Sequence, residues 1–291
     1  MAWLTLLLLV VVTCLSAYLR HSAAGLGCAA WPVCFGQGES AAAGAVVLGG
    51  QALTVARVAH RVTATLALLL VMAIVVLSWA RRPRLAREAA LSLGLLVLAL
   101  LLALLGVFTP GSRLPAVAIG NLLGGFLMLA IAARLVAPPA QRGLGASAIA
   151  AALLLLAQIA LGALTSAAYA GLACTDLREC VEQARAGGWN WAALNPWREP
   201  VLSMATPNPE GALAQLLHRL GSFVVAPPLL AGLGICAWRG GRRVEATALL
   251  VVLASQVVLG LVVGSTGLPL VPVLAHNLGT ALMLALVLRL A

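Results

Sequence analysis

Long apolar segments separated by polar linkers dominate the pattern of hydrophobic and polar positions along the chain. A helix rises 1.5 Å per residue, so roughly 20 apolar residues cross the hydrocarbon core of a bilayer. Eight segments are about that long, and we predict that each is a transmembrane helix. They lie at about residues 2–19, 53–79, 89–109, 115–136, 147–170, 211–237, 244–265 and 270–290.

The composition supports an integral membrane protein. Of 291 residues, 63% are hydrophobic and only 9% are charged, whereas a soluble domain has about 25% charged residues. All 18 basic residues are arginine, and the net charge is +10. These arginines flank the apolar segments, which indicates lipid as the partner and argues against nucleic acid. No small-residue cleavage site precedes Arg20, so we interpret the first segment as a retained span.

The charged residues also predict an orientation. Ten arginines fall on one face, with Glu88 and Glu245 as the only acids there, while two long linkers on the other face carry most of the acids. The positive-inside rule makes the arginine-rich face cytoplasmic. We therefore expect a multi-pass protein of a bacterial inner membrane with both termini in the cytoplasm. The ten arginines are Arg81, Arg82, Arg84, Arg87, Arg134, Arg142, Arg239, Arg242, Arg243 and Arg289.

Matching motifs divide the chain into two copies of a four-span unit. "GLGCAAWPVC" matches "GLACTDLREC" with an offset of 174 − 28 = 180 − 34 = 146. "HRVTATLALLL" matches "HRLGSFVVAPPLL" at 218 − 60 = 158, and "NLLGGFLMLAIAARL" matches "HNLGTALMLALVLRL" at 276 − 121 = 155. An even number of spans gives both units the same orientation, with a pseudo-twofold axis along the membrane normal. The predicted fold is all-α, with four-helix bundles at residues 1–136 and 147–291.

Three histidines are expected at one depth. His60, His218 and His276 each lie about six or seven residues into a span that starts outside, roughly 10 Å below the outer edge. His218 and His276 can face each other across the second bundle and supply the two axial ligands of a low-spin heme. Alternatively, each histidine hydrogen-bonds a neighbouring carbonyl. Their equal depth in a repeated unit favours heme, and the absence of acids at that depth disfavours zinc.

The first half differs at one ligand position. Asn121 stands where the second half has His276, and an amide is a weak iron ligand. A heme bound there through His60 is therefore five-coordinate or takes water as its sixth ligand. Arg61 and Arg219 each follow a histidine and can pair a heme propionate, although snorkelling to lipid headgroups is the alternative. We interpret His21 as an interfacial side chain rather than a ligand.

Two pairs of cysteines lie in the long outer linkers. Cys28 and Cys34 are separated by five residues, as are Cys174 and Cys180. Because the outer side of a bacterial inner membrane is oxidising, we predict one disulfide within each linker. Redox-active cysteines are the alternative, but neither pair is a CxxC motif. A c-type heme is not expected, because the chain contains no CxxCH motif.

The combined motifs resemble the heme A synthase family of cytochrome oxidase assembly proteins. They are "LSAYLRHSAAGLGCAAWPVCFGQ", "HRVTATLALLL", "LTSAAYAGLACTDLREC", "LLHRLGSFVV" and "HNLGTALM", and they span both halves. The resemblance implies a membrane enzyme that oxidises the C8 methyl of heme O to the formyl of heme A. It further implies that His218 and His276 hold an electron-relaying heme b and that His60 belongs to the pocket for substrate heme. A heme O synthase is a candidate source of heme O, whereas no motif identifies the electron donor or a homo-oligomer.

Two residues depart from the family pattern and keep other functions open. The family often has a glutamate three residues before the first histidine, where this chain has Arg57. Arg57 lies almost one turn nearer the outer surface than His60 and can neutralise a propionate. Together with Asn121, it favours the alternative of a non-catalytic membrane b-type cytochrome or heme carrier. A transporter is disfavoured, because the polar sites of a transporter are expected at the membrane midplane, whereas those predicted here lie near the outer surface.

Overall fold

The structure is a computed structural model that describes residues 1–23, 49–81, 85–108, 112, 114–138, 144–200 and 209–291. These residues form helices and no strands, and eight helical segments are long and apolar enough to cross a membrane. This confirms the predicted all-α membrane class. The segments are α1 (Ala2–Ala23), α2 (Gly49–Ala80), α3 (Ala86–Phe108), α4 (Pro115–Val136), α5 (Ala146–Ala167), α7 with α8 (Ala212–Leu220 and Ala226–Arg239), α9 (Arg243–Ser265) and α10 (Leu270–Leu290).

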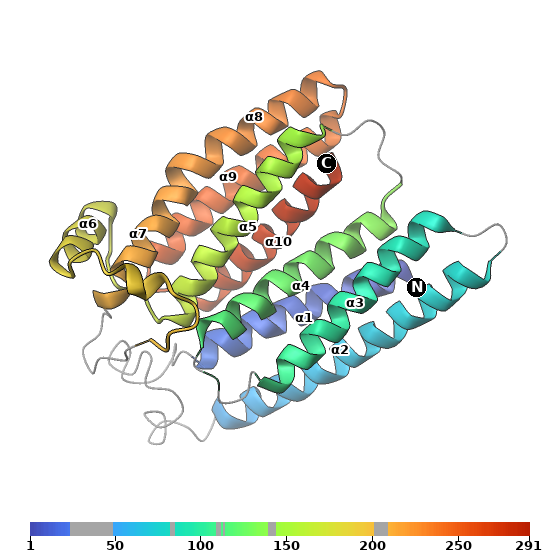
Figure 1. Cartoon of the computed structure of the whole chain (residues 1–291), viewed down its shortest axis with the longest axis horizontal. Helices are drawn as coiled ribbons and strands as arrows, with labels where there is room; N and C mark the ends of the chain where they lie inside the picture. The colour runs from blue at the N-terminus through green and yellow to red at the C-terminus, as the bar shows by residue number, and fades with distance from the viewer. Residues whose placement is uncertain (24–48, 82–84, 109–111, 113, 139–143, 201–208) are drawn as a thin grey trace.

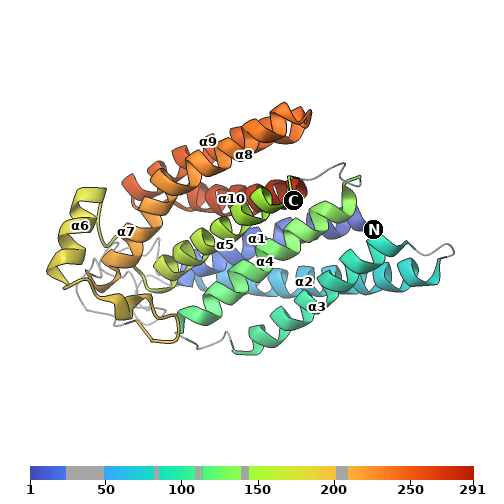
Figure 2. The same ribbon diagram turned by 45° about the horizontal axis from the view of Figure 1, so that its top comes forward.

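Four helices form the centre of the molecule. Helix α4 packs against α1, α5 and α10, and α10 also packs against α1 and α5. Helices α2 and α3 flank this centre on one side, and α8 and α9 flank it on the other (Figures 1 and 2). Both termini lie at the same end of the bundle (Figure 1). The predicted halves therefore meet along their first and last spans.

The outer surface of the spans is apolar, as a hydrocarbon solvent requires. Large hydrophobic side chains on α2, α3 and α9 are about half exposed or more. Between helices, small residues allow close approach. Gly120 and Gly124 of α4, for example, lie against the side chains of Leu105 and Leu102 of α3. The outward-facing residues include Leu66, Leu69, Leu100, Leu104, Val251 and Val258.

The sixth span is interrupted, which the sequence analysis did not predict. A π-helical turn, η4 (Gly221–Val225), separates α7 from α8. The cause is the pair Pro227 and Pro228, which have no N–H to donate to the carbonyls four residues before them. Ala226 N–H bonds instead to Gly221 O, five residues earlier. The break begins three residues after His218.

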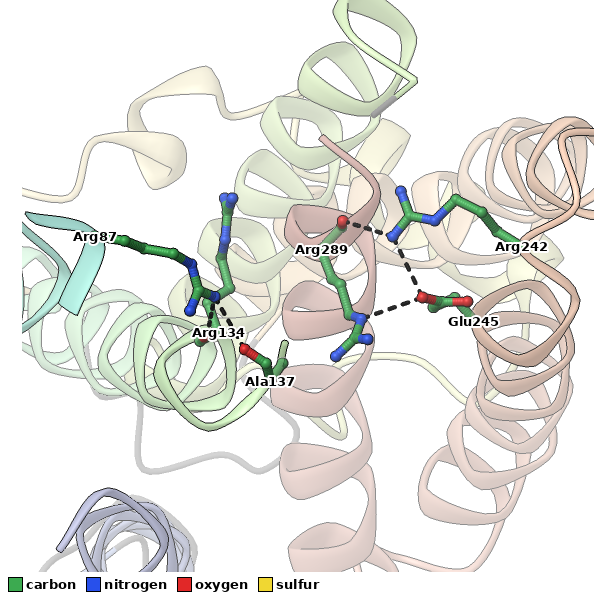
Figure 3. Close-up of polar contacts among 6 residues, drawn as sticks. All are labelled: Arg87, Arg134, Ala137, Arg242, Glu245 and Arg289. Carbon is green, nitrogen blue, oxygen red and sulfur yellow. Dashed lines mark hydrogen bonds and ion pairs between the residues drawn. The ribbon is translucent and has the colours of Figure 1, made fainter. Parts of the chain in front are cut away.

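Each half contains a similar hydrogen bond between its third and fourth spans, from α3 to α4 in the first half and from α9 to α10 in the second. Arg87 Nη2 at the start of α3 donates to Arg134 O in the last turn of α4, at 2.5 Å. Arg242 Nη2 at the start of α9 donates to Arg289 O in the last turn of α10, at 2.9 Å (Figure 3). The offsets are identical, 242 − 87 = 289 − 134 = 155, and equal the Asn121–His276 offset. This agreement supports the predicted repeat.

The second copy of this contact has an additional acid. Glu245 Oε1 accepts hydrogen bonds from Arg289 Nε at 3.3 Å and Arg242 Nη2 at 3.5 Å (Figure 3). The position one repeat earlier, 245 − 155 = 90, is Ala90. In both halves an arginine satisfies a carbonyl that a helix C-terminus leaves without an intrahelical partner.

The linker between α5 and α7 contains helical segments that were not predicted. They are α6 (Leu177–Ala186) and the short 3₁₀ turns η2 (Trp191–Leu194) and η3 (Pro209–Gly211). Ala116 N–H, in the first turn of α4, donates to Pro196 O at 2.8 Å. The second-half linker therefore also contacts the first half.

Candidate functional site

The histidines of the second half lie near the start of their spans, as expected. His218 is in the last turn of α7, and His276 is six residues after the start of α10. Both side chains are partly buried. Each ring lies against a glycine of a neighbouring helix. A Cβ on Gly162 would lie 2.7 Å from His218 Cε1, and one on Gly260 would lie 3.7 Å from His276 Cε1.

A buried glutamine of α5 holds His218. Gln158 is 9% exposed, and its Nε2 lies 2.9 Å from His218 Nδ1. The same nitrogen donates to His218 O at 2.6 Å and to Ser222 Oγ at 2.6 Å. Gln158 therefore holds the backbone of His218 and the hydroxyl of Ser222 beside the imidazole.

A second buried glutamine, on α9, contacts the turn of α10 that follows His276. Gln256 is 6% exposed, and its Oε1 is 2.9 Å from Thr280 Oγ1. Thr280 Oγ1 also lies 2.8 Å from His276 O. Among the described residues, Gln256 Nε2 and His276 Nδ1 are buried without a hydrogen-bond partner. One of these unpaired nitrogens is on α9 and the other is on α10.

Arg219 connects this site to the disulfide of the outer linker. Its Nη1 donates to Thr175 O at 2.7 Å and its Nη2 to Cys174 O at 3.0 Å. Cys174 and Cys180 form the predicted disulfide, and both are buried. Arg219 was predicted either to pair a heme propionate or to extend to lipid headgroups. Here its guanidinium anchors the linker, while Cys28 and Cys34 lie outside the described residues.

The start of α6 is fixed by a cap next to that disulfide. Asp176 Oδ1 accepts from Glu179 N at 2.8 Å, which is a typical N-cap hydrogen bond. Glu179 Oε2 accepts from the Thr175 hydroxyl and, at 2.6 Å, from Thr175 N. Both bonds lower the pKa of the Glu179 carboxyl below its usual value, and the bond from the Thr175 hydroxyl has the larger effect.

The first-half candidates are spread along two helices. His60 of α2 and Asn121 of α4 are partly buried, whereas Arg57 and Arg61 are exposed. Arg20 of α1, which the sequence analysis did not assign to the site, is close enough for its charge to act on His60. Because Arg57 and Arg61 are exposed near the start of α2, each can pair either with a heme propionate or with a lipid headgroup.

The end of α1 is bound to the second half. Arg20 Nη2 donates to Asn277 Oδ1 at 3.2 Å, and Asn277 directly follows His276. His21 Nε2 lies 2.9 Å from Leu268 O in the turn before α10. His21, expected at the interface as a non-ligand, therefore has a structural partner. Arg20 therefore links the end of α1 to the turn of α10 that carries His276.

The second-half site fits a heme better than a metal ion bound by side chains alone. Within the described ranges, no group of three or more His, Cys, Asp or Glu residues could hold a metal ion. Two imidazoles suffice as axial ligands of a heme iron, because the porphyrin supplies the other donors. The buried unpaired Nδ1 of His276 and the glycines beside both rings agree with such a site.

Comparison with known proteins identifies the family. The family model of COX15-CtaA, described as cytochrome oxidase assembly protein, matches residues 1–288. A relative named heme A synthase, from Shewanella oneidensis, is 30% identical, and the match covers 98% of this chain and 93% of the relative. The match extends through both halves and includes every candidate residue discussed above. The chain belongs to the family of cytochrome oxidase assembly proteins.

Proposed function

We propose that this protein is a heme A synthase, an oxidoreductase that converts the C8 methyl of heme O to the formyl of heme A for cytochrome oxidase. The similarity to a protein named heme A synthase over nearly the full chain supports this function. The observation that carries it is the pair His218 and His276, each six residues into its span with its ring against a glycine of a neighbouring helix. A redox protein with a heme ligated by two histidines requires such a pair.

The two halves have different tasks in this proposal. His218 and His276 hold heme b in residues 147–291, where it supplies one-electron transfer when bound. His60, in residues 1–136, is the ligand for substrate heme, and Asn121 leaves the opposite face without a strong ligand. That difference suits an exchangeable substrate, because a single axial ligand releases product more readily than two.

Arginines near the outer end of the pockets orient the heme through its propionates. Arg20 is a candidate, because its guanidinium donates to the neutral side chain of Asn277, the residue after His276. Arg57 and Arg61 lie on the same helix as His60 and can approach a propionate from the surface. Arg219 acts through the linker that it anchors. A guanidinium binds a carboxylate with two parallel hydrogen bonds.

The membrane is part of the mechanism. Heme O carries a farnesyl tail, which can extend between helices into lipid while the porphyrin remains in the pocket. We place the chain in a bacterial inner membrane with both termini cytoplasmic, on the basis of its arginine distribution. Its further partners are a heme O synthase that supplies substrate and an external electron donor, whose electrons together with those of the methyl group reduce dioxygen as the oxidant. Self-association of the chain is compatible with its exposed apolar faces.

A non-catalytic b-type cytochrome or heme carrier is the second candidate. Arg57, in place of a glutamate, and Asn121 favour it, because both remove groups that the family resemblance associates with the first-half chemistry. Heme extracted from protein purified with heme O supplied separates the two functions. A synthase yields heme A on chromatography, whereas a carrier yields only heme B and heme O.

A further inference from the structure

Two corresponding arginines, in the last turns of α4 and α10, have different surroundings. They are Arg134 and Arg289, which are related by the repeat offset, since 289 − 134 = 155. Both residues are partly buried. A guanidinium stays charged in a protein, so a partly buried one near the end of a span requires acceptors or an anion. The source of that anion differs between the two halves.

In the second half the chain itself supplies the anion. The carboxylate of Glu245 accepts hydrogen bonds from both Arg289 and Arg242, so one acid joins two guanidiniums (Figure 3). Glu245 lies three residues after Arg242 in the first turn of α9, and residues three apart share a helix face. The Arg289 guanidinium is therefore paired without a ligand from outside the chain.

The first half has the two arginines without that acid. Ala90 occupies the position of Glu245, and it is exposed. Arg87 Nη2 donates only to backbone oxygens, those of Arg134 at 2.5 Å and of Ala137 at 3.1 Å (Figure 3). In the part of the chain that the structure describes, no hydrogen bond or ion pair reaches the Arg134 guanidinium. The space next to Ala90 is therefore where a carboxylate stands in the second half.

Glu88, the acid in the first turn of α3, does not replace Glu245. Its Oε1 lies 3.7 Å from Arg87 Nη1, which is an ion pair but too long for a hydrogen bond. Residues two apart do not share a helix face, so Glu88 points away from the face that Ala90 shares with Arg87. The donors of the Arg134 guanidinium therefore remain for a group from outside the chain.

The place of these arginines in the fold indicates the class of ligand. They lie at the ends of two spans, which is the depth of the headgroup phosphates in a bilayer. Helix α3 is at the edge of the bundle, where lipid can reach it (Figure 1). A guanidinium binds a phosphate with parallel hydrogen bonds, and the positive end of a helix dipole at the start of α3 also favours an anion.

We propose that Arg87 and Arg134 bind the phosphate of an anionic phospholipid, which takes the place that Glu245 has in the second half. A headgroup without a cation is favoured, because choline or ethanolamine would bring a positive charge next to the two guanidiniums. The bound lipid joins the start of α3 to the end of α4. His276 lies near the opposite end of its span from Arg289, so the inference does not depend on the proposed function.

The test titrates the full chain, in an uncharged detergent, with short-chain phosphatidylglycerol and counts bound lipid by native mass spectrometry. Ala90→Glu supplies the acid of the second half and should weaken binding about 10-fold, whereas the neutral Ala90→Gln should bind as the wild type does. Arg134→Gln should also weaken binding about 10-fold. Arg239→Gln is its matched control, because it removes an exposed arginine from the end of α8 and should change nothing.

Phosphatidylcholine and inorganic phosphate separate the possible ligands. The wild type should bind phosphatidylglycerol more tightly than phosphatidylcholine, and inorganic phosphate at an equal concentration should not displace the lipid. Equal binding of the two lipids, or displacement by inorganic phosphate, overturns the anionic-lipid assignment. Equal binding by Arg134→Gln and Arg239→Gln, or by Ala90→Glu and the wild type, overturns the site itself. If Ala90→Gln weakens binding as much as Ala90→Glu does, the comparison of the two arginine variants decides.

Discussion

Gly162 of α5 lies so close to His218 that a Cβ on it would be 2.7 Å from Cε1 of the imidazole. The corresponding distance from Gly260 to the ring of His276 is 3.7 Å, an ordinary van der Waals contact. Gly162→Ala should therefore displace the His218 ring, whereas Gly260→Ala should be tolerated. The low-spin heme spectrum of each purified variant measures the difference.

Gly94→Ala is the control for these substitutions. No atom outside its own helix turn lies within 4 Å of a Cβ at Gly94 of α3, and alanine in a helix is favoured over glycine by about 1 kcal/mol. This variant should keep the wild-type spectrum and lose no stability. An unchanged spectrum in Gly162→Ala would show that the His218 ring is not an iron ligand in the position described.

His218→Ala and His276→Ala should each remove the six-coordinate low-spin signal from the reduced spectrum. Loss of one axial imidazole would leave the iron with five ligands, which is high-spin rather than low-spin. Absorption and EPR spectra of the purified variants provide the measurement. Wild-type low-spin bands in either variant would refute the ligand assignment.

Asn121→His should convert a high-spin component of the heme spectrum to low-spin. Asn121 corresponds to His276 in the repeat, and an imidazole nitrogen there would complete six-coordinate ligation opposite His60. Asn121→Ala is the comparison, and it should keep heme binding but alter reactivity. A heme spectrum that is identical in the wild type and Asn121→His would mean that this residue does not face the first-half iron.

The cap of α6 should weaken in acid. Hydrogen bonds from Thr175 lower the pKa of Glu179 in the folded protein. The ionised carboxylate therefore stabilises α6 fully above its unfolded pKa of about 4.3, and this stabilisation is lost as the pH falls through the lower folded pKa. The carboxyl is exposed, so the effect is below about 1 kcal/mol. Hydrogen exchange of residues 177–186 should accelerate over that range. Thr175→Val should accelerate it at neutral pH, and equal exchange in this variant and the wild type would contradict the assignment.

The sequence predicted the spans because apolar length is a local property. All eight were found within a few residues of their expected limits. It missed the π turn at Gly221–Val225, although Pro227 and Pro228 were visible and signal a broken helix. It also missed α6, whose ten residues are too few to cross a membrane and which is fixed by a cap, a disulfide and the buried side chains of Cys180 and Ala184.

The candidate site was only partly predictable, for reasons of geometry. His218 and His276 could be found because histidine is rare in this chain and both occupy equivalent spans. Gln158 is 60 residues before His218, and only packing of α5 against α7 brings them together. Arg219 follows a histidine, but its bonds to Cys174 O and Thr175 O depend on the path of the linker. Gln158 could have been found as a polar residue inside an otherwise apolar span.

The division of labour between the halves is tested most directly by one variant, His60→Ala, expressed with heme O supplied. The purified protein is measured twice, by its low-spin spectrum and by chromatography of the extracted heme. We predict that heme A is absent while the low-spin heme b spectrum held by His218 and His276 is unchanged. Heme A at the wild-type level in His60→Ala would contradict the account.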